Sequence, residues 1–116
     1  MNIFISYSTG DRDVVEIIGG HILSFGGRSW VDYKDLRLDR DILPQISNGI
    51  SASDVFLVVG KKSLSRSSWM KIEFSLANQL GIPTLILDGS RSEILDTYIN
   101  WSSTVRASEE WGRVGA

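Results

Sequence analysis

The run Val55–Val59 constrains the fold of this chain more than any other segment. Its five residues are all apolar, and Asp54 and Gly60 close it at either end. A strand with one exposed face alternates apolar and polar side chains, whereas a continuous apolar run is typical of a strand buried on both faces of a parallel sheet. Because parallel strands need crossover connections, helices are expected before and after this strand.

The rest of the sequence supplies such connections. Short strand-like runs lie at residues 3–7, 29–31 and 84–87, and segments with apolar residues at helical spacing separate them at 14–25, 42–50 and 69–80. Residues 32–41 and 60–66 are expected to be loops. This alternation predicts an α/β fold, a flavodoxin-like doubly wound parallel sheet with helices on both faces.

The C-terminal part of the chain has a weaker pattern. Residues 94–99 are expected to form a short helix, 104–107 a last edge strand that brings the sheet to about five strands, and 108–111 the start of another helix. The 116 residues fit one domain with a single core. Because the last helix is cut short, we expect residues 1–116 to be a domain excised from the N-terminus of a longer, multidomain protein.

Composition argues against several classes of function. The chain has no cysteine and a single histidine, His21, so no disulfide framework and no metal site is expected. His21 lies in an apolar helical stripe and is expected to be a core or boundary residue. A net charge of −2 provides no basic field for nucleic acid. No apolar run approaches the roughly 20 residues of a membrane span, and no signal peptide precedes the first strand, so we expect a soluble, cytoplasmic protein.

Trp69 and Glu73 are the most informative candidate functional residues. In a helix they lie four residues apart on one face, where the apolar residues Ile72, Leu76 and Leu80 bracket them. Glu73 is therefore expected inside a buried stripe. Burying an unpaired carboxylate is costly or raises its pKa, which favours a functional role. The alternative is a structural carboxylate that is ion-paired or bonded to backbone at the edge of the stripe.

The expected ligand site lies beyond the carboxyl ends of the strands, as in other open α/β sheets. The residues expected at this rim are 6–8, Trp30 to Asp32, Gly60 and Asp88. Glu73 reaches the same rim from the second turn of its helix. Tyr7, Trp30 and Trp69 would present flat surfaces to a base or nicotinamide ring, and Asp32 and Glu73 could bind sugar hydroxyls. Trp30 and Asp32 could equally just end a strand and start a turn.

Three other ligand-binding motifs are not supported. A phosphate loop that ends at Gly60 would need a glycine where Val55 stands, and the dinucleotide fingerprint G-x-G-x-x-G is absent. A phosphoacceptor receiver domain would need an acidic pair after the first strand and an aspartate after the third. Ser6-Tyr7 and Gly60 occupy those places.

Taken together, the motifs resemble the TIR (Toll/interleukin-1 receptor) domain family, in its bacterial NAD-cleaving type, from about Asn2 to Asp88. The matching segments are Phe-Ile-Ser-Tyr-Ser at 4–8 with Asp11, residues 27–30 with Asp32, Ile-Ser-Ala-Ser-Asp at 50–54, and Ser-Ser-Trp-x-x-x-Glu at 67–73. The resemblance implies that Glu73 is the catalytic residue. The substrate-binding residues that we expect around it are Tyr7, Ser8, Asp11, Trp30, Asp32 and Trp69.

The resemblance further implies cleavage of the nicotinamide-ribose bond of NAD, which is the substrate, with no other cofactor. Because the leaving group is neutral nicotinamide, no general acid is needed, unlike ordinary glycoside hydrolysis. One carboxylate can hold the ribose hydroxyls and stabilise an oxocarbenium-like transition state. The product would be ADP-ribose or cyclic ADP-ribose.

Partners are implied on the same basis. TIR enzymes resemble domains that assemble head to tail, with the loop at residues 32–41 as the movable piece, and such contacts propagate into filaments. A C-terminal sensor or effector domain and a role in antiviral defence signalling are also expected from the resemblance. The alternative function is a non-catalytic interaction or adaptor module, which would not need an acid in the helix stripe.

Overall fold

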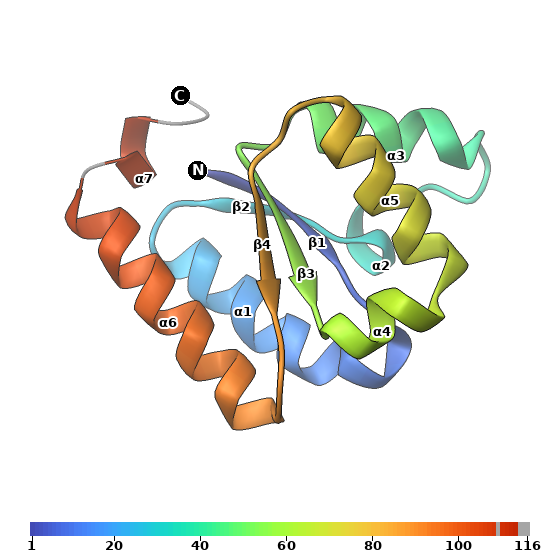
Figure 1. Cartoon of the computed structure of the whole chain (residues 1–116). Helices are drawn as coiled ribbons and strands as arrows, with labels where there is room; N and C mark the ends of the chain where they lie inside the picture. Colours follow the sequence, from blue (N-terminus) through green and yellow to red (C-terminus); the bar gives the residue numbers. More distant parts are fainter. Residues whose placement is uncertain (109, 114–116) are drawn as a thin grey trace.

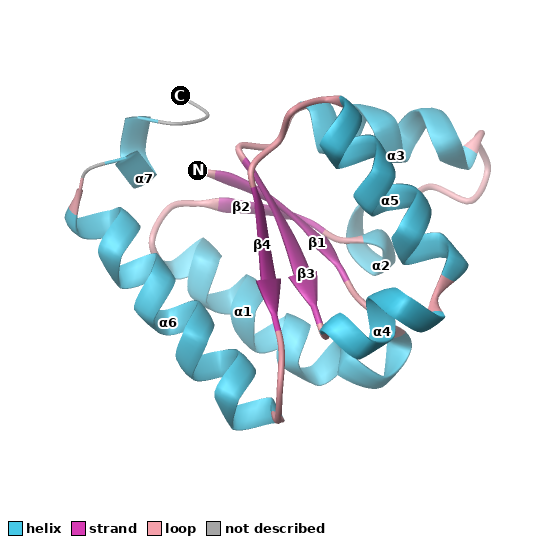
Figure 2. Cartoon of the chain, in the orientation of Figure 1, coloured by secondary structure: helices cyan, strands magenta, loops and turns pink. Residues whose placement is uncertain are grey.

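The computed structural model describes residues 1–108 and 110–113, which form a parallel β-sheet between two layers of helices (Figures 1 and 2). The strands are β1 (Asn2–Ser6), β2 (Arg28–Trp30), β3 (Val55–Val59) and β4 (Thr84–Leu87), in the order β2-β1-β3-β4. Every neighbouring pair is parallel. The sheet grows from β1 to β2 on one side and to β3 on the other, so the topological switch point lies between β1 and β3. The predicted flavodoxin-like α/β fold is confirmed.

Each face of the sheet has its own helices and its own core. Helices α1 (Arg12–Ser24) and α6 (Arg91–Ala107) cover the face that carries Ile3, Ile5 and Leu57. Helices α3 (Ile42–Ser51) and α5 (Ser68–Gln79) cover the opposite face, where Phe4 and Phe56 stack with ring centroids 5.4 Å apart. Because side chains alternate along a strand, Ser6 lies on the same face as Phe4. β1 therefore ends with a hydroxyl that faces the α3 and α5 layer.

Four short helical segments complete the described chain: η1 (Thr9–Asp11), a 3₁₀ turn, and the helices α2 (Asp32–Asp35), α4 (Lys61–Arg66) and α7 (Glu110–Arg113). The expectation of loops at 32–41 and 60–66 is wrong where α2 and α4 form. In α2, the Asp35 carboxylate accepts a hydrogen bond of 2.8 Å from the Val31 N–H. The Asp32 carboxylate accepts one of 2.7 Å from the Tyr33 N–H. The two hydrogen bonds stabilise a single helical turn.

The expectation of a fifth strand at 104–107 is also wrong, because α6 continues through these residues. Ser90 and Glu93 form a capping box at its N-terminus. The buried residues Ile94 and Tyr98 then keep helical spacing against the α1 layer, and Val105 packs on the same core. The predicted helix at 94–99 is thus the middle of a longer one. The predicted helix start at 108–111 corresponds to α7, with residue 109 outside the described residues.

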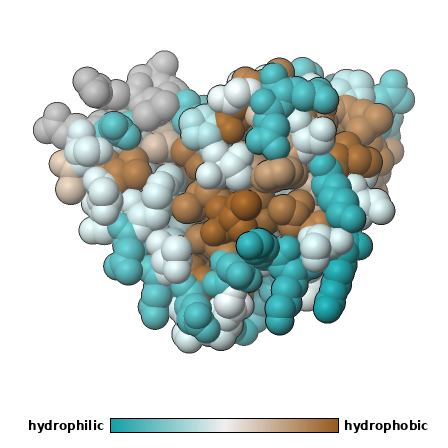
Figure 3. Space-filling model, viewed as in Figure 1, coloured by the Kyte–Doolittle hydropathy of each residue, from teal (hydrophilic) through white to brown (hydrophobic). Residues whose placement is uncertain are grey.

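In the described sheet, β4 is an edge strand. Figure 3 shows apolar side chains gathered over it, and Ile86 is among the exposed large apolar residues. Across the described residues, no helix is long and apolar enough to cross a membrane.

His21 lies between α1 and α6. Its Nδ1 is 2.9 Å from the Tyr98 hydroxyl, and the two rings meet edge to face. Burial, and then the charge of Arg106, lower the pKa of His21. The prediction that His21 is a partnered boundary residue is confirmed.

Candidate active site

Glu73 is buried beneath the carboxyl end of β1. Its residue exposure is 4%, and its Oε1 accepts a hydrogen bond of 2.8 Å from the Ser6 hydroxyl, which is itself buried. Burial raises the pKa of Glu73 to about 7, while the hydrogen bond from Ser6 lowers it and the negative charge of Asp32 raises it. The carboxyl group is therefore poised to gain or lose a proton near neutral pH.

The local sequence sets the position of Glu73 within α5. The Ser67 hydroxyl accepts a hydrogen bond from the Met70 N–H and caps the helix, which fixes its first turn. Met70, Glu73 and Ala77 then form the buried face, at spacings of three and four residues. Met70 and Ala77 join the core around Phe4, so Glu73 is the one acid between two core residues.

The prediction that Glu73 is buried is confirmed, but the stripe used to derive it is wrong. Ile72 and Leu80 are exposed, and Leu76 is only partly buried. Helix α5 carries two apolar columns, one through Met70 and Ala77 and one through residues 69, 72 and 76 that continues to Leu80 just after the helix. The sheet packs against the first column. Glu73 lies between the columns, so either choice would have predicted its burial.

Tyr7 and Asp32 form a second pair beside Ser6 and Glu73. The Tyr7 hydroxyl donates a hydrogen bond of 2.7 Å to Asp32 Oδ1. Burial, and then Asp32, raise the pKa of Tyr7, so its hydroxyl stays a donor across the physiological range. The Tyr7 ring also meets that of Tyr33 edge to face. These contacts join the end of β1 to α2, at the start of the predicted loop.

Ser8 and Asp11, which follow β1, belong to a separate group beside the segments that follow β3 and β4. The Ser8 hydroxyl donates to Ser63 Oγ at 3.2 Å, and the Ser63 hydroxyl donates to Asp11 Oδ2 at 3.3 Å. Asp11 and Ser63 line a hollow of about 440 Å³, together with Lys62 of α4 and with Asp88, which follows β4. No direct hydrogen bond joins this group to Glu73 in the described part of the chain.

The two tryptophans occupy different environments. Trp30 stacks on Phe4 with centroids 4.7 Å apart, and it approaches Gly49 of α3 so closely that a Cβ there would lie 2.8 Å from its Nε1. Its position favours packing, and a substrate contact stays a prediction. Trp69 is 37% exposed in the first turn of α5, one turn before Glu73. It is placed to border a ligand at Glu73, and that role also stays a prediction.

The arrangement offers one buried carboxyl, two hydroxyl donors and a second carboxylate at the β1 rim. Sequence reasoning placed Ser6 at the rim but did not predict its hydrogen bond to Glu73, although a hydroxyl at the end of an apolar strand was a usable signal. Within residues 1–108 and 110–113, no group of three or more His, Cys, Asp or Glu side chains could hold a metal ion. The carboxyl groups and hydroxyl donors at this rim can supply electrostatic stabilisation and the binding of hydroxyls.

Comparison with known proteins places this chain in a family. A search among curated proteins finds no match to this chain. Among solved structures, this chain is similar to one described as "Structure of the activated Roq1 resistosome directly recognizing the pathogen effector XopQ (TIR domains)". The TM-score is 0.66 and the sequence identity 15%, over 98% of this chain and 82% of that chain. At that identity the likeness shows the fold. The sequence model described as TIR domain matches residues 3–108, so the chain belongs to the TIR domain family.

Proposed function

We propose that this TIR domain is an NAD glycohydrolase (NAD⁺ nucleosidase) that releases nicotinamide from NAD in the cytoplasm. The observation that carries the proposal is the buried Glu73 carboxyl, with its pKa raised to about 7, at the topological switch point of the sheet. Structural ion pairs also bury carboxylates, but Glu73 forms no ion pair among the described residues. Its hydrogen-bond partner is instead the neutral hydroxyl of Ser6.

In the proposed reaction, the C1′–N bond of the nicotinamide ribose breaks and its electron pair leaves with the neutral ring. Glu73, as the carboxylate, binds the ribose hydroxyls and stabilises the positive charge that develops on the ribose. Water then adds to C1′ and loses a proton, which yields ADP-ribose; attack by an adenine nitrogen would yield the cyclic product. Tyr7 and Asp32 position the end of β1 against α2, and Trp69 borders the site.

The second candidate function is self-association, either to activate the enzyme or as the whole role of a non-catalytic adaptor. Gln45 holds the segment after α2 through two hydrogen bonds to the Arg37 backbone, at 2.7 and 2.8 Å. Beyond that point, Leu38 is 83% exposed. We take this exposed apolar side chain, on a loop that Gln45 holds in place, as the contact point for another copy. Head-to-tail assembly through residues 32–41, activated by a further domain in a defence protein, is therefore part of the proposal.

The test is nicotinamide release from NAD at high protein concentration, followed by chromatography. Glu73→Gln should abolish release while its circular dichroism spectrum stays that of the parent. Glu93→Gln is the matched control, because Glu93 is exposed and glutamine can also complete a capping box. Undiminished release by Glu73→Gln would refute the assignment.

Self-association is measured separately by sedimentation. Leu38→Asp should weaken it and lower the concentration dependence of activity without loss of folding. Assembly that depends on Leu38 but releases no nicotinamide at any concentration would favour the adaptor function.

A further inference from the structure

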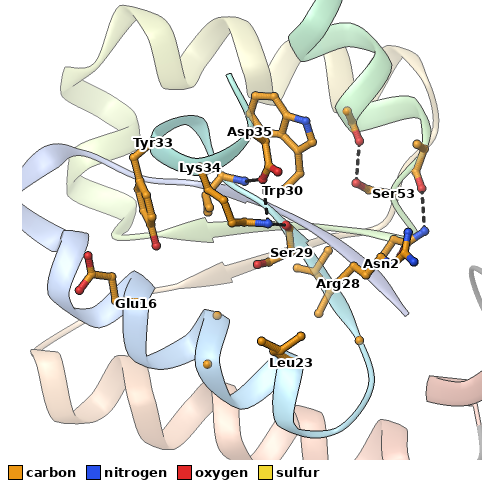
Figure 4. Close-up of a pocket in the computed structure, with 17 residues that line it drawn as sticks. Asn2, Glu16, Leu23, Arg28, Ser29, Trp30, Tyr33, Lys34, Asp35 and Ser53 are labelled. Atoms are coloured by element: carbon orange, nitrogen blue, oxygen red, sulfur yellow. Dashed lines mark hydrogen bonds and ion pairs between the residues drawn. The ribbon is translucent and has the colours of Figure 1, made fainter. Parts of the chain in front are cut away.

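A groove of about 610 Å³ runs along the outer edge of β2, and Glu73, Tyr7 and Ser8 are not among the residues that line it. Figure 4 shows Leu23 of α1 on one side, Trp30 on the other, and Asn2 with Arg28 at one end. Its volume falls within the roughly 300–1,000 Å³ of small-molecule sites. The groove is thus a second cavity, which shares only Trp30 with the residues predicted to form the active site.

Glycines of α1 leave room in this groove. Gly19 and Gly20 line it, and a Cβ added to Gly20 would meet nothing within 4 Å. Leu23, one turn further along the helix, is 73% exposed. A glycine pair weakens the interior of a helix, and here the missing side chains leave open space on the α1 side of the groove, beside apolar side chains. The space along Gly19, Gly20 and Leu23 suits an apolar or aromatic body.

The charges of the groove leave one cation without a counterion. Glu16 pairs with Arg12, and Lys34 pairs with Asp35. Arg28, by contrast, makes no ion pair among the residues that the structure describes. The groove therefore has an uncompensated positive charge at the end where Arg28 and Asn2 lie (Figure 4). A bound molecule with one anionic group would complement it.

An added β-strand fits this edge less well. The Lys34 ammonium donates a hydrogen bond of 2.7 Å to the Ser29 carbonyl, so an acceptor of the strand edge is already occupied. A lysine placed over an edge strand is also a common barrier against pairing with another chain.

We propose that this groove binds a small organic anion with an apolar or aromatic body. Its carboxylate, sulfonate or phosphate pairs with Arg28, and its body lies along Gly19, Gly20 and Leu23 against the Trp30 side. Tyr33 also lines the groove and contacts Tyr7, so the ligand binds next to α2, which carries Asp32. The site goes beyond the proposed NAD chemistry and does not depend on it.

The test uses 8-anilinonaphthalene-1-sulfonate, a fluorescent aromatic anion, as the probe. It is titrated into the folded, ¹⁵N-labelled domain, and both the fluorescence and the amide shifts are followed. Saturable binding is expected, with shifts concentrated at residues 16–35 and 49–53. Arg28→Gln should weaken binding about tenfold or more, because it removes a charge-assisted hydrogen bond.

Gly20→Leu should weaken binding at least as much by filling the groove, and it should fold, since replacing a helical glycine favours the helix. Arg66→Gln and Thr97→Leu are matched controls at exposed positions outside the groove and should bind as the parent does. Amide shifts centred elsewhere, or unchanged binding by both groove variants, would overturn the proposal. A loss of self-association in Gly20→Leu, with probe binding retained, would assign the groove to a second copy instead.

Discussion

Replacing Glu73 with glutamine is expected to stabilise the protein at pH 8 much more than at pH 5. Burial raises the pKa of Glu73 to about 7 in the folded protein, from an ordinary value of 4.5. Between these values the folded state holds a proton that the unfolded chain has released. The free energy of unfolding therefore falls as the pH rises through this window, and the loss is complete above about pH 7.

The size of the effect follows from the same two values. One pKa unit corresponds to about 1.4 kcal/mol, so the ionised Glu73 destabilises the folded state by about 3 kcal/mol at pH 8 and by less than about 1 kcal/mol at pH 5. Glutamine has nearly the same shape, and its Oε1 can still accept the hydrogen bond from Ser6. Relative to Glu73→Gln, the parent should lose about 2 to 3 kcal/mol between pH 5 and pH 8.

Urea unfolding followed by circular dichroism at several pH values measures this difference, with Glu93→Gln as the control. His21 contributes with the opposite sign, because burial lowers its pKa and the folded state gains stability as the imidazole loses its proton. That contribution is common to parent and variants, so it cancels in the difference. A pH-independent difference between the parent and Glu73→Gln would refute the reasoning.

Two further predictions concern the site and its support. Ser6→Ala should move the acidic limb of the pH profile of nicotinamide release about one pH unit upward from pH 7, because the hydrogen bond that lowers the pKa of Glu73 is lost. The pH profile of kcat/KM measures this shift, and an unchanged profile would contradict the prediction. Gly49→Ala should destabilise the fold by about 1 to 3 kcal/mol, because the added Cβ would overlap Trp30. Gly20→Ala should stabilise the fold by about 1 kcal/mol, because a Cβ there meets nothing and alanine favours the helix. Urea unfolding compares the two variants, and equal effects would contradict the packing argument.

The layered fold could be predicted from sequence because each core strand carries its own signal. Val55–Val59 lies second from one edge of the sheet, and its continuous apolar run reflects burial on both faces. The prediction of a strand at 104–107 was wrong because a segment of four residues is too short to show a periodicity of its own. Its helical state depends on a start signal at Ser90, more than ten residues earlier, and on packing against α1.

The candidate site was predictable where spacing alone decides the geometry. Glu73 lies between two apolar columns, so its burial follows whichever column faces the sheet. The packing of Trp30 could not be predicted from spacing, because its stacking on Phe4 and its close approach to Gly49 depend on how β1, β2 and α3 come together. The Tyr7 and Asp32 pair likewise required the register of β1 with β2, in which Phe4 lies beside Trp30.

The cost of ionising Glu73 bears directly on the two candidate functions. A scaffold gains nothing from a carboxylate that destabilises the fold near neutral pH, and glutamine would remove the penalty with little change of shape. An NAD glycohydrolase would use the same feature, because a nicotinamide cation beside Glu73 favours its ionised form and so lowers its pKa. In the proposed reaction, substrate binding near pH 7 is therefore coupled to release of the proton from Glu73. The carboxylate would then form in the presence of the positive charge that it must stabilise.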